Sequence, residues 1–89
     1  MTAPALVLTG ELTIGEAAAQ HEKLRDALAA GQCRLDLAGI EACDSAGVQL
    51  LLAARRSAQA QGLLLTIDAP SAALQESLHR YGLDHLLAH

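Results

Sequence analysis

The chain has 89 residues, with 6 basic and 10 acidic side chains and a hydrophobic fraction of 52%. This length suits one domain, and a net charge of −4 argues against nucleic-acid binding, which needs a basic surface. No apolar run approaches the roughly 20 residues that span a bilayer, and no secretory signal follows Met1. We therefore expect a single cytoplasmic domain over residues 1–89, without membrane insertion.

The first third of the chain predicts a strand and a helix. Residues 5–13 form a short apolar and then alternating run, which is typical of a strand. Thr13-Ile14-Gly15-Glu16 matches the capping-box pattern and predicts a helix over about 16–30. The face of this helix that we expect to be buried contains Ala17, His21, Leu24 and Leu28.

The middle of the chain predicts a second strand and a second helix. Residues 34–38 alternate between polar and apolar side chains, and Gly39 is expected to end this strand. A loop over 40–44 would then lead into a helix over about 46–61, which stops before Gly62.

The last third predicts a third strand and two further helices. Residues 63–67 are continuously apolar, as expected of a strand that is buried on both faces. Helix-start residues at 68–71 predict a helix over about 71–81, and three leucines suggest a short final helix near 84–88.

The order of these elements predicts the fold class. Strands that alternate with helices form right-handed crossover units, whose strands are parallel and neighbouring. We therefore expect an α/β domain with a small, mainly parallel sheet covered by helices.

Asp44-Ser45-Ala46-Gly47 stands where function is concentrated in such folds, at the carboxyl end of a strand and the start of a helix. Either Asp44 or Ser45 could accept a hydrogen bond there as the N-cap residue. A phosphoryl group on Ser45 would lie at the positive end of the helix and add about −1.5 to −2 charge. Such a change would alter recognition by a partner without moving the backbone. The alternative is that both residues only cap the helix.

Asp44-Ser45-Ala46-Gly47 and the residues that follow it resemble the Asp-Ser/Thr-Ser-Gly-Leu signature of STAS domains, the family of anti-sigma-factor antagonists. The resemblance extends over the chain from residue 5. Further similar segments, in family order, are Thr9-Gly10-Glu11-Leu12, Arg34-Leu35-Asp36-Leu37 with Ile40, and the ending from Leu74 through Tyr81-Gly82-Leu83 to Leu86-Leu87.

The resemblance implies a non-enzymatic protein-interaction switch with a STAS fold. Ser45 would be the phosphoacceptor, modified by a partner that is both a serine kinase and an anti-sigma factor, and Asp44 would shape the loop. The unmodified form would bind this partner, and phosphorylation would block binding. The residues expected to contact the partner are Asp44, Ser45, Ala46, Gly47, Val48, Gln49, Leu52 and Arg55.

Two departures from the family pattern affect these expectations. Ala46 replaces a second serine, which leaves the phosphoacceptor in place. Relatives usually have one more strand at the amino end, for which this sequence has too few residues. Residues 5–13 would then form an exposed sheet edge, through which a homodimer or a partner could pair.

Other functions of STAS domains stay open as alternatives. One is an accessory subunit on the ATPase of a phospholipid-trafficking ABC transporter, or an adaptor associated with chemotaxis. Another is a module that binds a small ligand. We expect no enzyme, because Ser45 lacks the Gly-x-Ser-x-Gly surroundings of a nucleophile and no histidine lies in a loop that follows a predicted strand. We also expect no cofactor and no metal, since His85 and His89, with His79 as a third ligand, are better explained as solvated histidines near the C-terminus.

Overall fold

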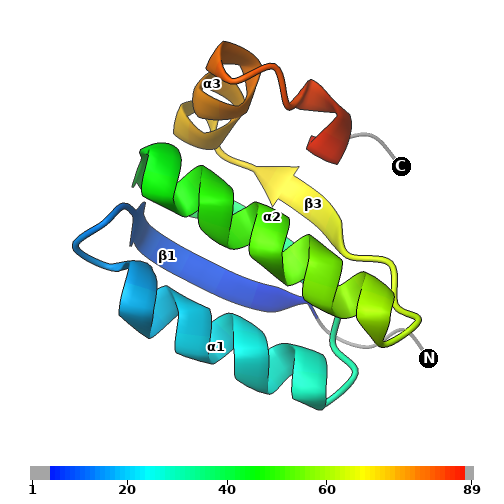
Figure 1. Ribbon diagram of the computed structural model, residues 1–89. Coiled ribbons are helices and arrows are strands. Elements are labelled where there is room, and N and C mark those ends of the chain that lie inside the picture. The colour runs from blue at the N-terminus through cyan, green and yellow to red at the C-terminus, as the bar shows by residue number, and fades with distance from the viewer. Residues whose placement is uncertain (1–4, 88–89) are drawn as a thin grey trace.

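The structure is a computed structural model that describes residues 5–87, and it alternates strands and helices as predicted (Figure 1). In chain order the elements are β1 (Leu6–Leu12), α1 (Ala17–Ala29), β2 (Arg34–Cys43), α2 (Ser45–Ala60), β3 (Thr66–Pro70), α3 (Ala72–Arg80) and the 3₁₀ helix η1 (Asp84–Leu87). The predicted final helix is therefore present, in the tighter 3₁₀ form.

The three strands form one parallel sheet in the order β1-β2-β3, which confirms the predicted α/β class. Both crossovers step across the sheet in the same direction, so their right-handedness places α1 and α2 on the same face. Figure 1 shows these two helices side by side over the sheet, with α3 beside the amino end of α2. The opposite face of the sheet bears exposed side chains such as Val7 and Asp68.

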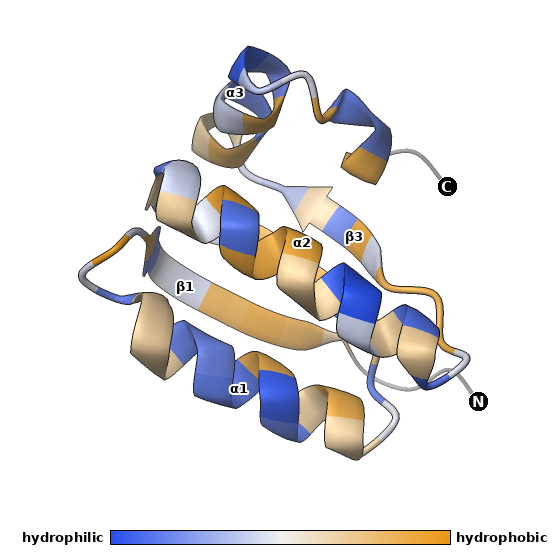
Figure 2. Cartoon of the chain, viewed as in Figure 1, coloured by the Kyte–Doolittle hydropathy of each residue, from blue (hydrophilic) through white to orange (hydrophobic). Residues whose placement is uncertain are grey.

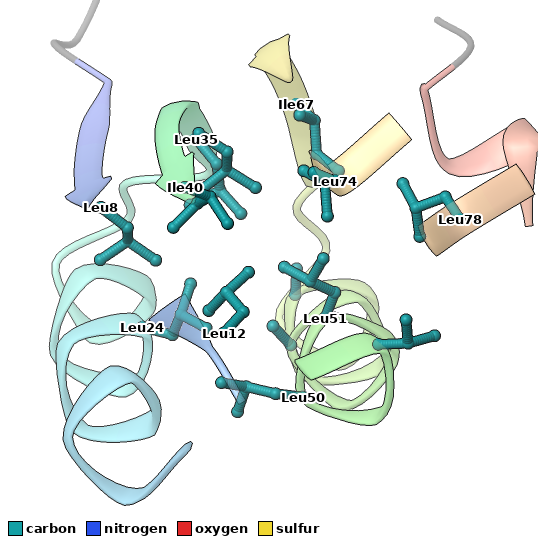
Figure 3. Packing of buried hydrophobic residues seen from close by; sticks show 14 of the residues in the cluster. Leu8, Leu12, Leu24, Leu35, Ile40, Leu50, Leu51, Ile67, Leu74 and Leu78 are labelled. Atoms are coloured by element: carbon teal, nitrogen blue, oxygen red, sulfur yellow. The ribbon is translucent and has the colours of Figure 1, made fainter. Parts of the chain in front are cut away.

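The core lies between the sheet and the helices and consists mainly of leucine. Figure 3 shows leucines and isoleucines of the strands directed towards side chains of α1 and α2. The largest fully buried side chains are Leu8, Leu12, Leu24, Leu35, Leu37, Leu51, Leu74 and Leu78.

The predicted end of the second strand at Gly39 is wrong, because β2 continues to Cys43. Pairing with β1 supplies the reason: Gly10 pairs with Ile40, and Leu12 pairs with Cys43. The side chain of Ile40 is only 2% exposed, so its burial favours the extended strand over the loop that Gly39 suggested. This extension carries β2 directly to the start of α2.

The third strand was predicted three residues too early. The backbone N–H of Leu63 donates to the carbonyl of Ala58 over 2.8 Å, so this residue wraps the end of α2. Gly62 has a φ of 77°, the left-handed conformation that allows this type of helix end. The strand therefore begins at Thr66, which pairs with Arg34.

The capping box predicted at the start of α1 is also wrong. The hydroxyl of Thr13 donates to the Glu11 carboxylate, and α1 begins after Glu16 without a side-chain cap. The buried polar residue of this helix is Gln20, which is 4% exposed, whereas His21 is exposed. The helix face is thus rotated slightly from the one expected.

β1 forms an edge of the sheet among the described residues, in agreement with the expected exposed edge. Part of this strand is already engaged by α1. The side-chain Nε2 of Gln20 donates to the carbonyls of Thr9, over 3.1 Å, and Glu11, over 3.3 Å. These bonds satisfy backbone groups that a further strand would otherwise use.

Candidate functional site

The candidate site lies where β1 and β2 end and α2 begins. The chain leaves β2 at Cys43, turns at Asp44 and enters α2 at Ser45, one residue before the predicted start of the helix. The backbone N–H of Asp44 donates to the carbonyl of Leu12 over 3.1 Å, which ties the turn to the end of β1. Function was expected at this end of the strands, and Asp44, Ser45 and Gly47 lie there.

Asp44 organises the site through both carboxylate oxygens. Oδ1 accepts from the backbone N–H of Gly47 over 3.1 Å, which makes Asp44 the N-cap residue of α2. Oδ2 accepts from the backbone N–H of Ile14 over 3.1 Å. The Ile14 bond, followed by the other backbone N–H groups around the carboxylate, holds the pKa of Asp44 below its usual value. One carboxylate thus joins the β1–α1 loop to the start of α2.

Gly47 allows α2 to start in direct contact with β1. The Cα of Gly47 lies close to Leu12, and a Cβ at this position would overlap the carbonyl of that residue. The site therefore needs glycine for close approach of two backbone segments, a reason that the sequence alone did not provide.

Ser45 is exposed and has no structural task within residues 5–87. Its hydroxyl takes part in no hydrogen bond there, because Asp44 provides the cap. Two other serines differ from it. Ser71 caps α3 by accepting from the N–H of Leu74, and Ser77 donates to the carbonyl of Cys43 over 2.7 Å.

The residues expected to contact a partner do not all share one surface. Ser45, Gln49 and Leu52 are spaced by four and three residues and lie on one face of α2, with Leu52 partly packed against the core. Ala46 is half-buried beside them. Val48 is only 3% exposed and belongs to the core, so its expected role as a contact residue is corrected.

Gly47 and Arg55 also depart from the expected contact surface. Gly47 is buried against Leu12, so it cannot contact a partner and instead allows α2 to lie close to β1. Arg55 lies on the flank of α2 that faces β3 and η1, where it lines a cavity with Ile67 and His85. The exposed contact surface is therefore narrower than the sequence suggested.

Sequence reasoning missed Ile14, whose side chain is 81% exposed beside the site. The bond from its N–H to Asp44 places it next to the start of α2, although 30 residues separate the two in sequence. Figure 2 shows that the β1–α1 loop, next to the start of α2, contains an apolar segment. No signal in the sequence indicated this placement, because it depends on a hydrogen bond between residues far apart along the chain.

A shallow groove between α1 and α2 opens beside the site. On the α2 side it is lined by Ala46, Gln49 and Ala53, and on the α1 side by Ala17 and His21. Alanine forms most of this lining, so few bulky side chains stand between the two helices near Ser45. No histidine within residues 5–87 forms a hydrogen bond with Ser45.

The cysteine beside the site is not activated. Burial raises the pKa of Cys43, more strongly than its hydrogen bond with Ser77 lowers it, and the nearby Asp44 raises it further. A raised pKa favours the protonated thiol at neutral pH. Residues 5–87 contain no group of three metal-binding side chains, and none of their helices is both long and apolar enough to cross a membrane.

Comparisons with known proteins agree with this geometry. A solved structure of a candidate anti-sigma factor antagonist from Thermotoga maritima is similar to this chain with a TM-score of 0.75. The two share 22% sequence identity over 91% of this chain and 74% of the other. None of the curated proteins compared with the chain matches it. The sequence model described as "Mlab, STAS domain" matches residues 2–88. Since this match covers nearly the whole sequence, the chain belongs to the STAS domain family.

Proposed function

We propose that this protein is a reversible protein-interaction switch, controlled by phosphorylation of Ser45. The observation that carries the proposal is the unused hydroxyl of Ser45, exposed at the first residue of α2 while Asp44 caps the helix. A residue that is both accessible and unnecessary for the fold can be modified without loss of structure. The family relationship and the similarity in fold to an anti-sigma factor antagonist support this proposal.

A phosphoryl group on Ser45 would leave the fold intact and would change the affinity for a partner. The N-terminus of a helix carries a partial positive charge, which favours an anion at its first residue. The added charge of about −1.5 to −2 would also lie beside an exposed apolar side chain, that of Ile14. An interface that buries Ile14 would then have to desolvate a dianion, which is costly.

The proposed contact surface consists of Ile14, Ser45, Ala46, Gln49 and Leu52. Ile14 supplies a large apolar side chain that a partner pocket can enclose, and Ala46 and Gln49 of α2 line the groove beside the site. Interfaces gain most of their affinity from a few such apolar or aromatic anchors, surrounded by polar groups. Asp44 stabilises this surface, because its carboxylate accepts the hydrogen bond from the N–H of Ile14 and so fixes the loop.

We propose a partner that is both a serine kinase and an anti-sigma factor, and a cytoplasmic setting in which such a kinase has ATP. The protein would itself catalyse nothing. Asp44 cannot easily act as a base for Ser45, because both its oxygens accept backbone hydrogen bonds and its pKa is lowered.

The test is a phosphorylation and binding assay with the serine kinase encoded nearest to the gene. Ser45→Ala should abolish labelling and keep binding, whereas Ser45→Asp should weaken binding. Ser57 provides the matched control, since it is an exposed serine on the same helix. Ser57→Ala should be labelled and Ser57→Asp should bind like wild type. Phosphate at another residue, or equal affinity of all variants, would reject the switch.

A second candidate function is a constitutive accessory subunit on the ATPase of a phospholipid-trafficking ABC transporter. The observation that favours it is that Asp44 fixes the loop without any phosphate, so the surface is already formed in the unmodified protein. In that case purified ATPase would bind wild type, Ser45→Ala and the kinase-treated protein with equal affinity. A chemotaxis adaptor would instead be recovered with chemotaxis proteins.

We also propose that two copies can pair through the edge of β1. The side chain of Gln20 occupies the carbonyls of Thr9 and Glu11, so pairing would use the amino-terminal half of the strand. Val7 lies in this half and is 60% exposed. A bare strand edge with an exposed apolar side chain favours pairing with another strand.

A further inference from the structure

A cavity separate from the Ser45 surface lies between α2, η1 and the segment that leads into β3. Its volume is about 220 Å³. The apolar side chains that line it are Leu51, Leu64, Leu65, Ile67 and Leu86, and its polar residues are Arg55, Thr66 and His85. This composition, mainly apolar with a few polar groups, is typical of sites for small ligands.

The segment 63–65 gives a first indication that the cavity is used. Three consecutive leucines there were expected to form a buried strand, but β3 starts only at Thr66. Leu64 is instead 65% exposed at the cavity. Figure 2 shows the connection between α2 and β3 as a strongly apolar stretch. Such a local conflict between sequence pattern and structure is often found where a protein binds something.

Arg55 gives the second indication. Within residues 5–87, ion pairs join Arg34 to Asp68, Arg80 to Glu76 and His79 to Asp84. Arg55 is half-buried at the cavity and has no carboxylate or carbonyl partner among these residues. A half-buried guanidinium without a partner favours an anion that can accept its hydrogen bonds.

His85 strengthens the preference for an anion. It lies on η1, at the same cavity as Arg55, and either ring nitrogen can donate a hydrogen bond. The only other polar side chain of the lining, Thr66, donates its hydroxyl to Asp68 over 3.4 Å. Asp68 is in turn paired with Arg34 and so is not available to neutralise Arg55.

We propose that this cavity binds a medium-chain fatty carboxylate. Its alkyl chain would lie among the leucines, and its carboxylate would accept hydrogen bonds from Arg55 and His85. The volume exceeds the ~150 Å³ of an engineered apolar cavity that holds benzene in another protein, so a chain of several carbons fits. Binding here would involve the flank of α2 opposite the α1 groove and would leave Ser45 exposed.

The test is a titration of the full chain with sodium octanoate below its micelle concentration, followed by the amide resonances of the protein. We expect saturable shifts at Leu64, Leu65, Ile67 and Leu86. Octanol, which lacks the charge, and acetate, which lacks the chain, should each bind at least ~10-fold more weakly.

Two arginines on α2 give a matched pair of variants. Arg55→Gln should weaken octanoate binding by about 10-fold, because it removes a charged hydrogen bond. Arg56→Gln should bind octanoate like wild type, because this neighbouring arginine is exposed and does not line the cavity. Both variants should keep the wild-type spectrum elsewhere, which shows that they fold.

Several results would overturn the proposal. One is the absence of saturable shifts, and another is an equal effect of the two arginine substitutions. Equal binding of octanol would remove the role of Arg55. Shifts centred on Ala53 and Ser57 would place the ligand in the groove between α1 and α2 instead. Shifts that appear only with phospholipid vesicles would indicate a membrane surface and not a single fatty carboxylate.

Discussion

Two adjacent residues have different tasks at the start of α2. Asp44 accepts hydrogen bonds from Ile14 and Gly47, whereas the hydroxyl of Ser45 accepts none within residues 5–87. The sequence left open which of them caps the helix. A serine that caps a helix would lose this bond on modification, so the assignment of the cap to Asp44 is what makes Ser45 suitable as a phosphoacceptor.

Asp44 should make the stability of the protein sensitive to acid. Its pKa is lower in the folded state than the usual value of about 3.9, so the carboxylate stabilises the fold above that pH. This contribution is lost as the pH falls from about 4 through the lowered pKa. Asp44→Asn keeps a capping group but has no charge to titrate, so it should show a smaller loss of stability. Urea unfolding at several pH values between 5 and 2 measures this, and equal losses in both proteins would contradict it.

Gly47→Ala should destabilise the protein, because a Cβ there overlaps the carbonyl of Leu12. Overpacking of this kind typically costs about 1–3 kcal/mol. Gly15→Ala is the control, since a Cβ at Gly15 meets no atom within 4 Å and should change stability by less than ~0.5 kcal/mol. Urea unfolding compares the two variants. Equal stability would show that α2 does not start against β1 as described.

Ile14→Ser should weaken partner binding without unfolding the protein. The side chain is 81% exposed, so its removal costs little stability, while loss of an apolar anchor typically reduces affinity by about 10-fold or more. Calorimetric titration with the kinase partner, together with the melting temperature, separates the two effects. Wild-type affinity in this variant would remove Ile14 from the contact surface.

At the scale of elements, Gln20 connects α1 to the edge of β1. Gln20→Ala leaves the carbonyls of Thr9 and Glu11 without their donor and should lower the free energy of unfolding by about 1–3 kcal/mol. Gln59→Ala, at an exposed position of α2, should have almost no effect. Equal unfolding midpoints for the two variants would show that Gln20 does not hold the edge.

The alternation of elements could be predicted from the sequence, but some boundaries could not. Short apolar runs and glycines located each strand and helix, and their order predicted the parallel sheet. The end of β2 depends on its pairing with β1, which lies about 30 residues earlier, and this pairing leaves no local signal. The start of β3 depends on how Leu63 closes α2.

The site was predictable only in part, for a similar reason. The family-like segment from Asp44 to Gly47 pointed to Ser45, which is exposed, and its role as phosphoacceptor stays a prediction. The burial of Val48 and the contribution of Ile14 both depend on how α2 rests on β1 and on the β1–α1 loop. A residue brought to a site by one backbone hydrogen bond cannot be found from spacing along the chain.

At the scale of the whole molecule, the exposed edge of β1 leads us to expect a monomer–dimer equilibrium. If two copies pair along the amino-terminal half of β1, sedimentation equilibrium should show a mass that rises from monomer towards dimer with concentration. Val7→Lys should shift this equilibrium towards monomer, because a lysine on an edge strand opposes pairing. A mass that stays monomeric at every concentration would exclude the homodimer.

The central claim is that phosphorylation of Ser45 changes the affinity of the protein for its partner and leaves its structure intact. The most direct measurement compares the protein phosphorylated at Ser45 with the unmodified protein, in melting temperature and in affinity for the same kinase partner. We predict melting temperatures within a few degrees of each other and an affinity that falls by at least about 10-fold on phosphorylation. An unfolded phosphoprotein, or one that binds the partner as tightly as before, would contradict the account.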